Sequence, residues 1–90
     1  MRIPDEFKLC GATWKVKFDH DMADDGQTSP ENQVITINSS NCRETQLRAF
    51  VHELLHACAI MAAIEDDEEL SEEKFIRRIE GILFSYLLEN

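Results

Sequence analysis

A regular apolar pattern over residues 47–64 constrains the fold of this chain more than any other segment. Its apolar side chains recur at spacings of three and four residues, the period of one helix face. They are Leu47, Phe50, Val51, Leu54, Leu55, Cys58 and Met61. Upstream, the side-chain oxygens of Ser39, Ser40 or Asn41 can cap a helix, and Glu44 falls near its positive end. The pattern therefore predicts a largely buried helix.

A second apolar stripe follows five consecutive acidic residues at positions 65–69. Ser71 can cap a helix there, and the acidic side chains after it suit the helix dipole. The stripe consists of Phe75, Ile76, Ile79, Ile82, Leu83, Tyr86 and Leu87. A linker of about seven residues favours antiparallel packing of neighbouring helices. We therefore expect a second long helix whose beginning lies near the end of the first.

The first half of the sequence has the two-residue period of β-strands. Apolar and basic side chains alternate through Trp14, Lys15, Val16, Lys17 and Phe18, which is typical of a strand with one buried face. Gly11 separates this strand from a shorter one at residues 7–10 in a predicted hairpin, although a bulge within one strand also fits. Residues 19–32 are expected to form a surface loop, and residues 34–37 a third strand. The expected fold is α+β, with a small three-stranded antiparallel or mixed sheet packed on two long helices.

Size and charge narrow the possible functions. The 90 residues correspond to a single domain, residues 1–90, with a thin core. A net charge of −9 disfavours binding to nucleic-acid phosphates, and no apolar run is long enough to span a membrane. Cys10, Cys42 and Cys58 form no C-x-x-C pair and indicate neither disulfides nor a thiolate metal site. We expect a cytoplasmic protein that binds neither nucleic acid nor membrane.

The predicted buried helix contains the pattern His-Glu-x-x-His at positions 52–56. Residues four apart lie one turn above each other on a helix, so His52 and His56 can direct both imidazoles to one ion. Glu53, one step around the helix, can reach a water molecule on that ion. Alternatively, the three are ordinary polar members of an amphipathic helix. Burying His and Glu among apolar neighbours is costly without a partner, which favours the metal site.

The residues alone do not decide which side chain is the third ligand of such a site. A catalytic zinc site has three protein ligands and one position for water. His20 lies in the predicted loop and can serve only if that loop folds over the helix. Glu72 and Glu73, at the beginning of the second helix, are expected close to His56. On a helical wheel centred on Ile79, Glu72 falls about 20° from the centre of the apolar stripe and Glu73 about 120° away, which favours Glu72.

Two segments, residues 52–56 (His-Glu-Leu-Leu-His) and 71–76 (Ser-Glu-Glu-Lys-Phe-Ile), follow the predicted small sheet. In this order the chain resembles the small phage-type zinc metallopeptidases related to the ImmA/IrrE family and, more distantly, the gluzincins. The resemblance implies a zincin-like minimal domain with one Zn²⁺ ion. It implies His52, His56 and Glu73 as the metal ligands and Glu53 as the general base.

Two positions depart from the pattern of that family. Four residues after the third ligand the family often has Asn or Asp, whereas this chain has Arg77. Seven residues after it the family has a small residue, whereas this chain has Glu80. The departures leave open which side chain orients a zinc-bound histidine.

The function implied by the resemblance is hydrolysis of peptide bonds in a peptide or protein substrate. Zinc would lower the pKa of its bound water and polarise the carbonyl, while Glu53 takes the proton of the water and returns it to the leaving amine. An extended substrate could add as a strand along the edge at residues 34–37. A second interpretation is a zinc-binding interaction or regulatory module with weak or no catalysis. A third is a purely structural metal that couples ligation to folding.

Overall fold

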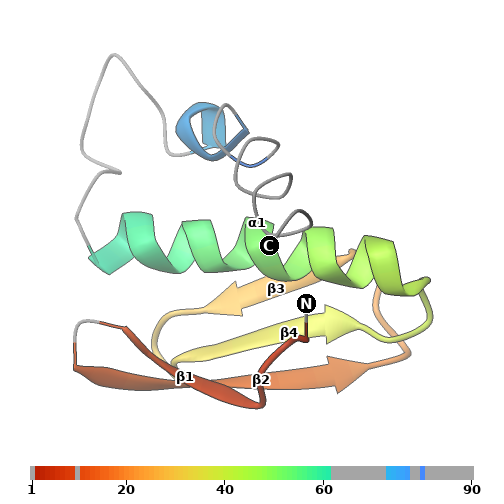
Figure 1. The fold of residues 1–90 in the computed structure, drawn as a ribbon, viewed down its shortest axis with the longest axis horizontal. Coiled ribbons are helices and arrows are strands. Elements are labelled where there is room, and N and C mark those ends of the chain that lie inside the picture. Colours follow the sequence, from red (N-terminus) through yellow and green to blue (C-terminus); the bar gives the residue numbers. More distant parts are fainter. Residues whose placement is uncertain (1, 10, 62–72, 78–79, 81–90) are drawn as a thin grey trace.

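Four strands and one long helix make up the framework of the part of the chain that the structure describes. The computed structural model describes residues 2–9, 11–61, 73–77 and 80. In chain order the elements are β1 (Glu6–Leu9), β2 (Ala12–Asp19), β3 (Gly26–Ser29), β4 (Val34–Asn38) and α1 (Arg43–Met61), and residues 73–77 and 80 are also helical. Figure 1 shows α1 across one face of the sheet, with the helical residues 73–77 on the other side of α1.

The hairpin at the start of the chain follows the predicted pattern. β1 and β2 pair antiparallel, and Gly11 lies in their connection with a φ of 83°, a conformation that favours glycine. Along β2 the predicted alternation is present, since Trp14 and Val16 are buried whereas Lys15 and Lys17 are exposed. Both strand predictions for this part of the chain are therefore confirmed.

The sheet has four strands in the order β1-β2-β4-β3, so the prediction of three strands is wrong. The additional strand, β3, lies within residues 19–32, which were expected to form a surface loop. Its sequence, Gly-Gln-Thr-Ser, has little intrinsic preference for a strand, and its antiparallel pairing with β4 fixes it instead. The buried Asn38 side chain also holds the preceding loop, because its amide donates to the carbonyl oxygens of Met22 and Asp24 at 3.3 and 3.2 Å.

Strand β4 occupies the interior of the sheet rather than its edge. It pairs parallel with β2 on one side and antiparallel with β3 on the other. Its main-chain groups are therefore already engaged in two ladders. The prediction that a substrate adds along residues 34–37 is wrong for this reason.

Helix α1 begins at Arg43, so the residue before its first turn, Cys42, lies one position after the predicted capping residues. The carbonyl oxygen of Cys42 accepts from the amide of Gln46 at 3.0 Å, which makes Cys42 the residue that precedes the first helical turn. The thiol of Cys42 lies 3.3 Å from the hydroxyl of Thr45, and this side-chain hydrogen bond lowers the pKa of the thiol. The strong helix prediction itself is confirmed over Arg43–Met61.

Opposite faces of α1 enter two apolar clusters. Towards the sheet, Ala49, Phe50 and Ala57 of α1 pack with residues of β2 and β4: Trp14, Val16, Ile35 and Ile37. On the other side, a stripe of α1 at four-residue spacing packs against the fully buried Ile76; the stripe consists of Leu47, Val51, Leu55 and Ala59. Both faces of α1 are thus covered by the rest of the chain.

This arrangement corrects the expected fold class further. A sheet packed on two long helices is wrong, because the sheet packs on α1 and α1 separates it from the helical residues 73–77 (Figure 1). In the described part of the chain α1 is the one long helix, and the remainder of the predicted second helix falls outside that part. Among the described residues, no helix has the length and apolar character required to cross a membrane.

Candidate metal centre

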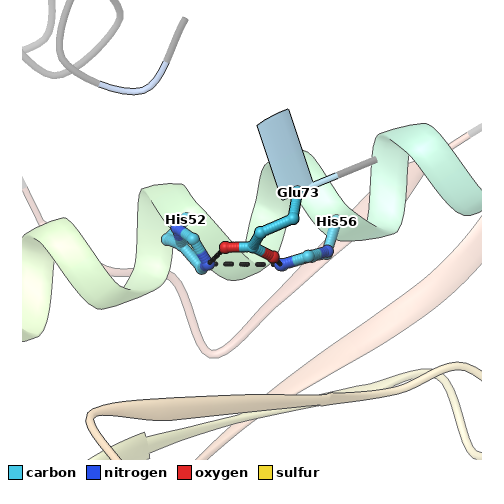
Figure 2. Close-up of side chains that lie close together, drawn as sticks. All are labelled: His52, His56 and Glu73. Atoms are coloured by element: carbon cyan, nitrogen blue, oxygen red, sulfur yellow. Dashed lines mark hydrogen bonds and ion pairs between the residues drawn. The ribbon is translucent and has the colours of Figure 1, made fainter. Parts of the chain in front are cut away.

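Two histidines one turn apart on α1 meet a carboxylate from the helical residues 73–77 and 80, here called the C-terminal helical segment. Figure 2 shows the Glu73 side chain reaching between the rings of His52 and His56. The His52 Nε2 atom lies 3.1 Å from His56 Nε2 and 3.5 Å from Glu73 Oε1, and His56 Nε2 lies 3.1 Å from Glu73 Oε2. The three side chains thus form a triangle whose three closest contacts, which use both Glu73 oxygens, measure 3.1 to 3.5 Å. With one ligand atom taken from each residue, all three atoms lie within 4.8 Å of one another.

The dimensions of this triangle suit a tetrahedral metal ion. Zinc–ligand bonds of roughly 2.0–2.1 Å at tetrahedral angles place neighbouring ligand atoms about 3.3–3.4 Å apart. The distances between the three side chains bracket that value. Two imidazole nitrogens and one carboxylate oxygen also form a donor set typical of catalytic zinc, with the fourth position left for water. His52, His56 and Glu73 therefore fit a zinc ion.

Exposure gives the centre access to solvent. The side chains of His52 and His56 are partly buried, whereas that of Glu73 is 46% exposed. A catalytic zinc site needs such access, because water or substrate must reach its fourth position.

The Glu53 carboxylate contacts strand β3, and the residue is only 8% exposed. The hydroxyl of Thr28 donates to Glu53 Oε1 at 2.8 Å and also lies 3.2 Å from the Glu53 carbonyl oxygen. Space for the carboxylate stem is available because Gly26 has no side chain, and a Cβ there would lie 3.0 Å from Glu53 Cγ. Residues of strand β3 therefore fix the position of the predicted base, Glu53.

A cavity of about 420 Å³ opens beside the centre. Its walls come from three parts of the chain: the beginning of β3, the N-terminal half of α1 and the C-terminal helical segment. Their lining residues are Asp24, Asp25, Gly26, Thr45, Arg48, Ala49, His52, Glu53, Arg77 and Glu80. The candidate ligand His52 and the candidate base Glu53 share this cavity, so a molecule bound there would contact both.

Two residues of the C-terminal segment contact the candidate ligands directly. Arg77 Nε lies 3.2 Å from Glu73 Oε1, and Glu80 Oε2 contacts His52 Nδ1. These are the two positions at which the chain departs from the family pattern, and their contacts did not follow from the resemblance. A signal was present in the spacing, because residues 73, 77 and 80 fall at i, i+4 and i+7 on one helix face.

The structure brings together three of the predicted site residues, His52, His56 and Glu73, and sets Glu53 beside them. His20 is exposed and is not a member of this group. Glu72, which the helical wheel favoured, lies outside the described residues, as does the acidic run at 65–69. No family model, curated protein or solved structure matches the chain.

Proposed function

We propose that this protein is a zinc-dependent metallopeptidase that hydrolyses peptide bonds of a peptide or protein substrate. The observation that supports the proposal is the group of His52, His56 and Glu73, whose ligand atoms lie close enough together to hold one metal ion. Glu53 follows His52 on α1, and the two residues line the same cavity. Metal ligands, a carboxylate base and a cavity for substrate are the minimum parts of metal-assisted hydrolysis.

Each residue has a separate role in this proposal. Zn²⁺ held by His52, His56 and Glu73 supplies a Lewis acid that activates a water molecule and polarises the substrate carbonyl. Thr28 donates to Glu53 Oε1 and so fixes the orientation of the carboxylate. In this proposal the other oxygen, Oε2, accepts a proton from the attacking water and later returns it to the leaving amine.

The substrate is proposed to bind along β3 rather than along β4. The main-chain amide of Asn38 in β4 donates to the Asp25 carbonyl oxygen at 2.9 Å. In an antiparallel pair every second residue is hydrogen-bonded to the partner strand, so after Asp25 the next residue of β3 that bonds to β4 is Gln27. The main-chain groups of Gly26 and Thr28 consequently face the outer edge of the sheet, which has no further strand in the described part of the chain. An extended peptide can pair with these groups beside Glu53.

In this proposal the protein is cytoplasmic and binds neither nucleic acid nor membrane.

Cleavage of an unfolded protein such as denatured casein by the zinc-loaded chain tests the proposal. Glu53→Gln keeps the size of the side chain and removes its basicity, so the cleavage rate should fall by at least about 100-fold with zinc content unchanged. Glu6→Gln changes an exposed glutamate of β1 in the same way and should retain full activity. Activity that survives Glu53→Gln would exclude this mechanism. Stoichiometric zinc without any cleavage would instead indicate a zinc-binding interaction module.

A further inference from the structure

Glu80 forms the closest contact between the C-terminal segment and a candidate metal ligand. Its Oε2 atom meets Nδ1 of His52, on the side of the ring opposite to Nε2. Both side chains are partly buried, with exposed fractions of 26% for Glu80 and 22% for His52. Partial burial strengthens a charge-assisted hydrogen bond because water competes less for the two groups.

The chemistry of the two groups determines where the proton of His52 lies. An ionised carboxylate can only accept a hydrogen bond, so His52 must donate from Nδ1. A neutral imidazole carries one proton, and Nε2 is then left with its lone pair. That lone pair faces His56 Nε2 at 3.1 Å and Glu73 Oε1 at 3.5 Å, which is the centre of the ligand triangle.

We propose that Glu80 is a positioning residue of the metal centre, which fixes His52 in the orientation and tautomer that present Nε2 to the ion. The inference rests on the proposed zinc site and deepens it. Metal-bound histidines commonly donate their second nitrogen to a carboxylate, which orients the ring and raises the basicity of the ligand atom. In this chain the carboxylate belongs to Glu80, seven residues after Glu73.

One face of the C-terminal helical segment supplies the ligand Glu73 and the two side chains that contact the ligands. Glu73 offers the carboxylate, Arg77 holds Glu73 Oε1 at 3.2 Å, and Glu80 holds His52. Buried Ile76 docks this segment against α1 and so keeps the three side chains in place. Glu80 therefore acts through His52 and does not bind the ion itself.

Competition between the purified protein and a chromogenic zinc chelator tests this role without any need for catalysis. Glu80→Ala removes the acceptor, and zinc affinity should fall by about 10- to 100-fold. Glu80→Gln keeps an acceptor oxygen without the charge, and its affinity should lie between those of wild type and Glu80→Ala. Glu44→Ala removes an equal charge from an exposed site on α1 and should stay within about twofold of wild type.

Two further measurements separate a positioning role from a merely structural one. The metal-free form of Glu80→Gln, which keeps an acceptor for His52 Nδ1, should melt close to the metal-free wild type, and Co²⁺ bound to Glu80→Ala should show altered visible absorption bands. If both Glu80 variants bind zinc as tightly as Glu44→Ala, the inference about Glu80 is overturned while the ligand assignment stands. If wild type binds no zinc, or His52→Ala binds it unchanged, the zinc site and the role of Glu80 are both overturned.

Discussion

At the scale of single residues, the spacing of the histidines determined the most about the site. Two imidazoles four residues apart on a helix must lie on one face, and the structure places His52 and His56 so that both Nε2 atoms face Glu73. The third ligand did not follow from spacing, because a helical wheel measures distance from an apolar stripe and not distance from another helix. The contacts of Arg77 and Glu80 were missed for the same reason, since they depend on how the C-terminal segment docks on α1.

Thr28 provides a sharp test of the proposed base at this scale. Thr28→Val keeps the shape of the side chain but removes the donor to Glu53 Oε1, so Glu53 should lose its fixed orientation. A hydrogen bond to a charged group is worth about 1.5–3 kcal/mol, and we expect kcat to fall by about tenfold or more with little change in KM. Thr28→Ser keeps the hydroxyl and should stay close to wild type in a cleavage assay. Equal activity of the Val and Ser variants would contradict this role for Thr28.

At the scale of elements, α1, β2 and β4 were predictable because their patterns are strong. Each has an apolar face whose period matches its secondary structure, as Trp14 and Val16 show in β2. Strand β3 could not be predicted, because Gly26-Gln27-Thr28-Ser29 carries the composition of a turn and pairs only through tertiary contacts. The omission mattered for function, since β3 contacts the candidate base and forms one of the two edges of the sheet in the described residues.

Close approach of β3 to α1 gives a prediction for Gly26. A Cβ at this position would lie 3.0 Å from Glu53 Cγ and 3.4 Å from Ala49 Cβ, so a larger side chain must displace part of α1. Gly26→Val should lower the free energy of unfolding by about 1–3 kcal/mol in urea denaturation, as overpacking usually does. Gln27→Val, at the exposed neighbouring position of the same strand, should change it by less than about 0.5 kcal/mol. Equal effects of both substitutions would argue against this close packing.

At the scale of the whole molecule, the acidic composition divides into two kinds of carboxylate. All 18 acidic side chains are counted in the net charge of −9, and three of them, Glu53, Glu73 and Glu80, also contact specific partners on or beside α1. A chain of this size has a thin core, so a ligand that joins α1 to the C-terminal segment should matter for its stability.

Zinc should therefore raise the melting temperature of the chain. At a free zinc concentration of 100 times the dissociation constant, binding to the folded state alone adds about 2.7 kcal/mol. For a domain of this size, that free energy corresponds to an increase of about 10 °C or more in a calorimetric scan. His56→Ala removes one ligand and should abolish most of the increase, whereas an increase of the same size in His56→Ala would assign the effect to zinc bound elsewhere.

The central claim is that His52, His56 and Glu73 hold one zinc ion. The most direct measurement is the zinc content of the purified chain after incubation with zinc and removal of the excess, compared with that of His52→Ala, His56→Ala and Glu73→Ala. We predict one zinc ion per chain in wild type and much less than one in each variant, with α-helical circular dichroism retained. Wild type without bound zinc, or variants that each retain one ion, would contradict the account.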